Sequence, residues 1–378
     1  MDARGRITAG ELRRHHLSVV LETVLRHAPI SRADVAGRTG LTRSTVSGLV
    51  AELLDGGLLR DAGTGRPAGS GRPGHRLVPD PAGPVGIGLR IEDDGVGGCL
   101  VDLAGRTGAR QWRRVALAVA GPVAAARAVR PVLRELLLAA AGGDRPAAGI
   151  VVAVPGVVGA DRSTVRTAPA LGWSDVDFGA LLAVEARTVG ADGIALSVRC
   201  GVTLAAAADG APSRGAAPRP RGAASSDGAA PGTVVYVGGR SEVGVVLLRD
   251  GVPCAGDSAI RFGHLTARRG GAACSCGRRG CVAAETGPDV PPARAGRALG
   301  GALAAFAAPL DPDAVVLGGR FAAAGAEFCT AVGAELARHG VPAERLHRST
   351  PAPGTTLRGA GGSALSGLVA DPGAWTPA

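Results

Sequence analysis

The sequence contains no lysine, few aromatic residues and no long apolar run. All 42 basic residues are therefore arginine, and against 32 acidic residues they leave a formal net charge of +10. An excess of this size favours a polyanionic partner such as nucleic acid, although an Arg-, Ala- and Gly-rich composition can also follow from genomic base composition. Because aromatic residues make up only 2% of a chain that is 46% hydrophobic, the core has to be built from Val, Leu and Ala.

The missing apolar runs argue against a membrane protein. The first residues, MDARGRITAGELRRHH, hold no apolar stretch that could act as a signal sequence. No later stretch reaches the roughly 18 residues needed to span a bilayer. We therefore expect a cytoplasmic protein. The chain of 378 residues is long enough for two or three domains, and its seven cysteines, an odd number, fit reduced thiols and a metal site better than disulfides.

Residues 30–59 predict a helix-turn-helix. Ser31 with Asp34 three residues later is typical of an N-terminal capping box, and Thr42 is a second N-cap. Gly40 supplies the tight turn between the two helices. The spacing therefore predicts two short helices joined by about four residues.

The second of these helices has two distinct faces. Its apolar residues recur at helical spacing, namely Val46, Leu49, Val50, Leu53 and Leu54. The opposite face begins with Arg43, Ser44, Thr45 and Ser47, the residue types with which a recognition helix reaches bases and phosphates in the major groove. The alternative is an ordinary amphipathic hairpin whose polar face is merely solvated.

A β-wing is expected next, from short strands at 58–60 and 75–78. Between them lie Gly65-Arg66-Pro67 and Gly71-Arg72-Pro73. Proline keeps the chain extended and glycine removes bulk, so Arg66 or Arg72 could enter a narrow minor groove. A flexible linker is the alternative. We assign residues 1–80 to a winged helix-turn-helix DNA-binding domain.

Residues 81–378 predict an α/β body. A strand pattern over VGIGLRI, GGCLVDL and RQWRRVAL is followed by a helical stretch at 124–141 and a buried strand at 150–154. Further on, AVVLGG predicts a strand, and residues 302–310 and 321–338 predict helices. The Pro-, Gly-, Ala- and Ser-rich stretch at about 207–232 is interpreted as a disordered insert.

A metal site is predicted from four residues in H-x9-C-x-C-x4-C spacing: His264, Cys274, Cys276 and Cys281. Thiolate and imidazole suit tetrahedral Zn2+, and four protein ligands leave no open position, which indicates a structural site. Gly277 and Gly280 let the loop fold back. The alternative is a set of free loop thiols beside a solvated histidine.

Taken in order, these segments resemble the ROK family (repressors, open reading frames and sugar kinases), in its transcriptional-repressor branch. The resemblance covers SRADVAGRTGLTRSTVSGLV, GSGRPGHRLVPDP, VVAVPGVVGADRSTVRTAPALGWSDVDF, FGHLTARRGGAACSCGRRGC and LDPDAVVLGGRF. It implies an N-terminal winged helix followed by an actin-like (ribonuclease H-like) fold of two lobes around a sugar cleft. It also implies that the same four residues bind zinc.

The chain differs from the family's kinases at the positions of the catalytic base, a phosphate-binding turn and the sugar-binding residues. The Asn-Asp pair that supplies the kinases' base falls on Cys200-Gly201, and Glu242 stands in a phosphate-binding turn, where it would repel phosphate. Two sugar-binding glutamates correspond to Arg261 and Ala283. We therefore expect no enzyme activity.

The resemblance places an effector cleft at Trp173, Cys200, Gly201, Arg261 and His264. This cleft would either take a sugar or an anionic small molecule, or serve only as an oligomerisation platform.

The sequence thus predicts a DNA-binding regulator that represses sugar transport or catabolism genes. Its partner is a double-stranded DNA operator, and it acts as a homodimer or tetramer because one short winged helix contacts too little DNA. The alternative function is a ROK-type sugar kinase with an accessory DNA-binding domain. A third hypothesis is a zinc- or thiol-responsive switch that uses the cysteine cluster.

Overall fold

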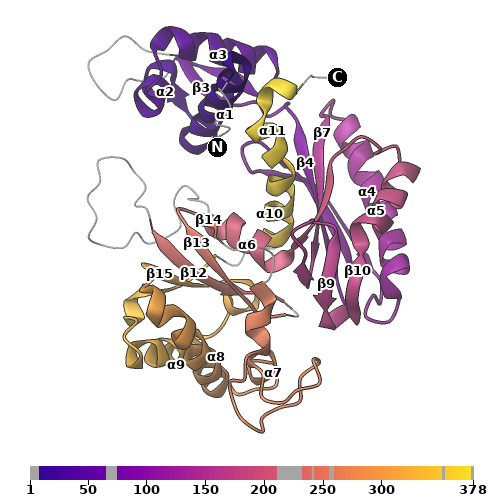
Figure 1. Cartoon of the computed structure of the whole chain (residues 1–378), viewed down its shortest axis with the longest axis vertical. Coiled ribbons are helices and arrows are strands. Elements are labelled where there is room, and N and C mark those ends of the chain that lie inside the picture. Colours follow the sequence, from indigo (N-terminus) through magenta and orange to yellow (C-terminus); the bar gives the residue numbers. More distant parts are fainter. Residues whose placement is uncertain are drawn as a thin grey trace, which may run out of the picture.

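The computed structural model describes residues 8–64, 75–210, 232–240, 242–254, 259–350 and 354–375. It contains an N-terminal winged helix and two α/β lobes (Figure 1). The predicted α/β class with an N-terminal winged helix is confirmed. In the described part of the chain, no helix combines the length and apolar character that crossing a bilayer requires.

The winged helix consists of three helices and a small antiparallel sheet. Its helices are α1 (Ala9–His27), α2 (Arg32–Thr39) and α3 (Arg43–Asp55), and its strands β1 (Ile30–Ser31), β2 (Leu59–Thr64) and β3 (His75–Pro79) pair in the order β1-β3-β2. The predicted caps are confirmed: Ser31 and Asp34 form a capping box, and Thr42 Oγ1 accepts from Thr45 N at 3.2 Å. Gly40 has a φ of +71°, which explains glycine at the turn.

The first lobe is built on a five-stranded sheet of order β11-β7-β4-β5-β6. Its elements in chain order are β4 (Val85–Glu92), β5 (Gly95–Asp102), β6 (Thr107–Arg114), α4 (Gly121–Ala141), β7 (Ala147–Val154), β8 (Val157–Val158), β9 (Thr164–Ala168), β10 (Trp173–Asp177), α5 (Phe178–Thr188), β11 (Leu196–Cys200) and α6 (Gly201–Gly210). Successive residues of β4 face opposite sides of this sheet. Ile87 and Leu89 pack with α4 in the main core, whereas Gly86 and Gly88 lie against the C-terminal helix α10 (Thr355–Ala364).

The second lobe has a sheet of order β14-β13-β12-β15-β16. It is formed by β12 (Thr233–Gly238), β13 (Gly244–Arg249), β14 (Val252–Pro253), α7 (Val282–Glu285), α8 (Pro292–Ala307), β15 (Ala314–Leu317), α9 (Ala326–Arg338) and β16 (Leu346–Arg348). Its core combines Val and Leu with three phenylalanines, Phe262, Phe321 and Phe328.

Three predicted boundaries are wrong. The helix expected at 302–310 is the second half of α8, which begins at Pro292 and ends at Ala307, before a 3-10 turn at Ala308–Leu310. Residues 207–210, assigned to the insert, continue helix α6, because a run of alanines has the highest helix propensity whatever its sequence complexity. The rest of the insert lies outside the described residues, apart from Gly232. Helix α9 begins at Ala326 rather than Phe321, because Gly319, with a φ of +53°, and Phe321 form a separate 3-10 turn.

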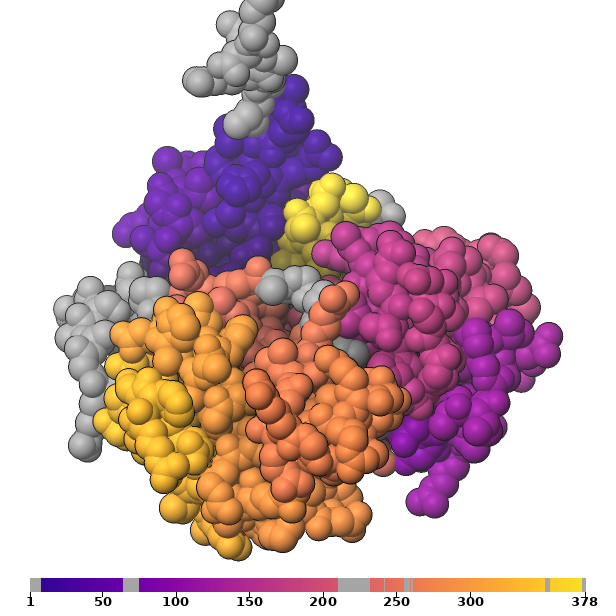
Figure 2. All heavy atoms as spheres, turned by 60° about the horizontal axis from the view of Figure 1, so that its bottom comes forward, coloured from indigo at the N-terminus to yellow at the C-terminus, as the bar shows by residue number. Residues whose placement is uncertain are grey.

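The winged helix and the first lobe share a hydrophobic core. The buried cluster of α1, α2 and α3 also contains Leu103 from the β5–β6 turn, Leu365, and Leu368 of helix α11 (Ser366–Ala370). Figure 2 shows the C-terminal segment, in yellow, against the indigo winged helix. The two parts are therefore joined by packing as well as by the chain at residues 80–84.

Candidate functional site

The first turn of α3 presents the predicted DNA-contacting side chains to solvent. Arg43, Ser44, Thr45 and Ser47 are all exposed, whereas Val46 is fully buried. Among the described residues the Arg43 guanidinium has no hydrogen-bond or ion-pair partner, so it is available to an external anion. The hydroxyl of Ser47 donates to Arg43 O at 2.8 Å and shapes the same turn.

Two further observations concern the winged helix. Arg13 of α1 forms an ion pair of 2.6 Å with Glu52 of α3, a contact that the sequence did not indicate. Arg66 and Arg72 lie outside the described residues. Their expected insertion into the minor groove stays a prediction.

The metal cluster brings together the four residues predicted to bind zinc. One ligand atom from each of His264, Cys274, Cys276 and Cys281 lies within 4.8 Å of the others. Bonds of about 2.3 Å to sulfur at tetrahedral angles place ligand atoms about 3.7 Å apart. The observed distances are 3.7 Å between Cys276 Sγ and Cys281 Sγ, and 3.5 Å between Cys274 Sγ and His264 Nδ1. The cluster therefore has the ligands and the dimensions that a tetrahedral metal ion requires.

The loop around the cluster depends on glycine. Gly280 has a φ of +72°, and a Cβ atom there would lie 1.6 Å from Arg268 O. Gly277, with a φ of +81°, makes the turn between the cysteine pair and Cys281. Gly280 therefore requires glycine and the conformation of Gly277 favours it, in line with the role that the sequence predicted for both.

Electrostatics within the cluster favour ligand formation at Cys276. Burial raises the pKa of its thiol, but hydrogen bonds from the backbone and side chain of Arg278 outweigh burial and hold the pKa at about 6. Burial raises the pKa of Cys281 to about 12, so this thiol depends on a metal ion for deprotonation.

Glu242 contacts the outer nitrogen of His264. Its Oε2 lies 3.3 Å from His264 Nε2, and the side chains of Glu242 and His264 are only 4% and 11% exposed. Hydrogen bonding to Glu242 raises the pKa of His264 to about 9. Since Nδ1 faces the cysteines, this arrangement matches a metal-bound histidine oriented by a carboxylate.

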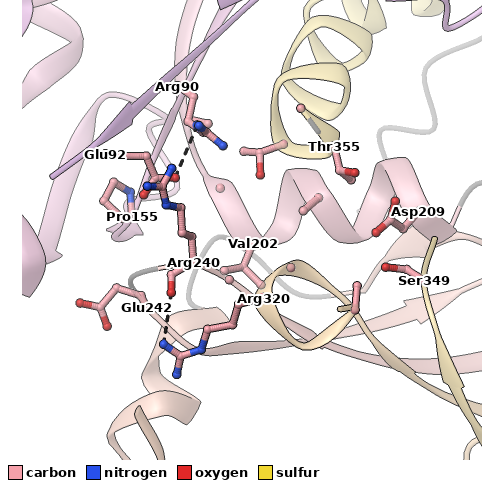
Figure 3. Close-up of a pocket in the computed structure, with 18 of the residues that line it drawn as sticks. Arg90, Glu92, Pro155, Val202, Asp209, Arg240, Glu242, Arg320, Ser349 and Thr355 are labelled. Carbon is pink, nitrogen blue, oxygen red and sulfur yellow. Dashed lines mark hydrogen bonds and ion pairs between the residues drawn. The ribbon is translucent and has the colours of Figure 1, made fainter. Parts of the chain in front are cut away.

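A cavity of about 310 Å3 lies between the two lobes. Figure 3 shows its lining, which comes from the first lobe (Arg90, Glu92, Asp209), from the second (Arg240, Glu242, Arg320) and from Thr355 of α10. Arg240 pairs with Asp94 of the β4–β5 turn at 2.8 Å, an ion pair between the lobes. The volume suits a small ligand.

The lining of this cavity differs from the expected effector residues. Of the five predicted residues only Gly201 lines this cavity. Trp173 is 4% exposed and its ring lies 4.8 Å from that of Phe178, because a large apolar ring at the start of β10 is buried beneath α5. Cys200 is fully buried in the core, His264 belongs to the metal cluster, and Arg261 is exposed outside the lining.

Comparisons with known proteins agree with this architecture. A model of the MarR family matches residues 18–67. A crystal structure described as a ROK family transcriptional regulator, homolog of the E. coli MLC protein, aligns with a TM-score of 0.71 and 16% identity over 95% of this chain and 97% of that chain. This chain has the fold of a ROK transcriptional regulator. The resemblance predicted from the motifs is thus confirmed at the level of the fold.

Two curated proteins are similar to parts of this chain in sequence. The Xylose repressor of Bacillus subtilis (strain 168) is 25% identical over 265 residues, 70% of this chain and 63% of that protein. Kanosamine kinase of Amycolatopsis mediterranei (strain S699) is 33% identical over 173 residues, 36% of this chain and 56% of that protein. The chain therefore matches less than two thirds of the length of either relative.

Proposed function

We propose that this protein is a cytoplasmic DNA-binding transcriptional regulator that represses sugar transport or catabolism genes. The observation that carries the proposal is the exposed first turn of α3. There the Arg43 guanidinium has no partner in the described part of the chain, and three hydroxyl side chains lie beside it above a buried apolar face. The MarR family match to residues 18–67 and the similarity to a xylose repressor support it. In the DNA complex, α3 enters the major groove, and Arg66 or Arg72 enters the minor groove.

We propose further that the two lobes carry no kinase activity. Gly201 stands at the start of α6, where the family resemblance implies the catalytic carboxylate, and glycine has no side chain to accept a proton. In the turns that would hold phosphates, Asp94 pairs with Arg240 and the buried Glu242 faces His264. Negative side chains in these turns oppose phosphate binding.

In the same proposal, Zn2+ is held by the metal cluster as a structural ion. It supplies fixed coordination that ties His264 to the cysteine loop, and four protein ligands leave no position for a substrate. The cavity between the lobes takes a sugar or another small effector, and the protein acts as a homodimer or tetramer so that two winged helices read paired half-sites.

DNA binding is tested by fluorescence anisotropy with duplexes from the region upstream of the protein's own gene. Arg43→Ala should weaken binding by about 1–3 kcal/mol if Arg43 contacts a base. Arg187→Ala, an exposed arginine on α5, is the matched control and should bind as the wild type does. A wild-type protein that binds no duplex at low salt would overturn the proposal.

The second candidate is a sugar kinase, favoured by the 33% identity to Kanosamine kinase. A phosphorylation assay with ATP, a hexose panel and amino sugars decides between the two functions. We expect no turnover. Phosphorylation at ordinary kinase rates, about 1–100 per second, would show that a residue other than Gly201 supplies the base.

A further inference from the structure

Two consecutive C-terminal helices extend from the cavity to the winged helix. Helices α10 and α11 are separated only by Leu365, and Figure 1 shows them in yellow between the centre of the molecule and the winged helix. Arg358 and Leu368 lie ten residues apart, about 15 Å along a helix axis. Each end of this pair makes contacts of a different kind.

The first turn of α10 belongs to the cavity. Gly354, Thr355 and Thr356 line it, and one turn later Arg358 Nη2 donates to Asp209 Oδ1 at 3.3 Å. The Asp209 side chain, at the end of α6, is only 9% exposed.

Asp209 also joins the two lobes. It accepts from Tyr236 Oη at 3.3 Å, and Tyr236 is on β12 of the second lobe. Burial raises the pKa of Asp209, whereas hydrogen bonding to Ser349 and the charge of Arg358 lower it. One buried carboxylate therefore connects α6, α10 and the second lobe at the edge of the cavity.

The far end of this helix pair, α11, packs against the winged helix. Leu365 and Leu368 are 4% and 7% exposed within the cluster formed by α1, α2 and α3. Ser18 Oγ of α1 donates to Val369 O at 2.7 Å, and Arg14 lies 3.6 Å from Asp371. A displacement of α11 therefore changes the support of α1.

Between its ends, α10 packs backbone to backbone. A Cβ atom on Gly86 would lie 2.0 Å from Gly361 O, and one on Gly359 would lie 2.0 Å from Leu204 O. Because no side chains separate α10 from β4 and α6 at these points, rotamer changes cannot absorb a shift of the helix. A change at one end is therefore passed on to the other.

We propose that α10 and α11 couple the cavity to the winged helix, with Asp209 as the residue that senses a ligand. A ligand that donates a hydroxyl or ammonium hydrogen to Asp209 competes with Arg358 and Tyr236, releases the first turn of α10, and so alters the packing of α11 on α1. The coupling rests on the proposed function, since it is the route by which an effector would reach the DNA reader. It goes beyond that function by naming the sensing residue and the connecting element.

Hydrogen–deuterium exchange of the full chain tests the coupling without a ligand, because Asp209→Asn removes the charge that holds Arg358. We expect amides of α1 and α11 to exchange at least about fivefold faster than in the wild type, the low end of typical coupling between sites. Amides of α9 should not change. Arg338→Ala, which removes an arginine paired with Glu335 on α9, is the matched control and should leave α1 and α11 unchanged.

Coupling between two sites is reciprocal, so Ser18→Ala should speed exchange of the α10 amides from Arg358 onward, the first that are bonded within that helix. This variant, together with Arg358→Gln, also decides the matter if Asp209→Asn does not fold. Faster exchange confined to α6 and the start of α10, or an equal increase in α9, would overturn the coupling. DNA is absent from these measurements, so their failure is distinct from a failure to bind duplexes.

Discussion

Glu242→Gln removes the charge that faces the outer nitrogen of His264 but keeps the size of the side chain and one acceptor oxygen. The two groups lie 3.3 Å apart with side chains 4% and 11% exposed, so water screens the interaction little. Loss of a carboxylate partner from a metal-bound histidine typically costs about 10- to 100-fold in metal affinity. This range corresponds to about 1.4 to 2.8 kcal/mol of zinc-binding free energy.

Competition with a chromophoric chelator measures this affinity. Purified protein is loaded with one equivalent of Zn2+, the chelator is titrated in, and the dissociation constant is obtained from absorbance. Glu242→Ala removes both charge and contact and should weaken binding at least as much as Glu242→Gln. Glu344→Gln changes an exposed carboxylate of the same lobe and should leave the affinity unchanged.

The refuting result is a change of less than about twofold for both Glu242 variants at unaltered zinc stoichiometry. Glu242 would then contribute nothing to the orientation of His264. Its burial between the cluster and the cavity would need another explanation.

Three further substitutions test the packing and the loop geometry. Leu368→Ala should lower the free energy of unfolding, measured by urea titration, by about 2–5 kcal/mol, as is typical of buried leucines. A loss below about 1 kcal/mol would contradict the place of Leu368 in the winged-helix core. Asp94→Asn breaks the ion pair with Arg240, in which the Arg240 and Asp94 side chains are 54% and 49% exposed. The free energy of unfolding should therefore fall by less than about 1 kcal/mol in the same titration, and a larger fall would mean that the lobes depend on this contact. Gly280→Ala places a Cβ atom against Arg268 O in a backbone conformation with positive φ. Elemental analysis should therefore find less than one equivalent of zinc in the purified variant, and a wild-type zinc content would contradict the loop geometry.

Local chemistry made the helix-turn-helix and the metal cluster predictable. The caps at Ser31 and Thr42 act over three residues, so their spacing can be identified in the sequence alone. The same holds for Cys274, Cys276 and Cys281, which lie within one loop. Strands with a buried face are likewise evident from apolar residues alone, as in β7.

Contacts between distant residues could not be predicted in this way. Asp209 and Arg358 are 149 positions apart, and Ser18 and Val369 are 351 apart, so no local pattern indicates either contact. The lining of the cavity differs from the expected effector residues for a related reason. A motif places Trp173 near a site in sequence, but the side on which its ring packs depends on α5, whose position only the three-dimensional structure gives.

The first three helices and the C-terminal segment share one hydrophobic core, so the winged helix is not an independent folding unit. A fragment that ends after β3 would expose the apolar surface that Leu103, Leu365 and Leu368 cover. Joining that fragment to another domain would require a matching apolar partner. Chimaeric regulators made from this chain should therefore carry α11 along with the N-terminal helices.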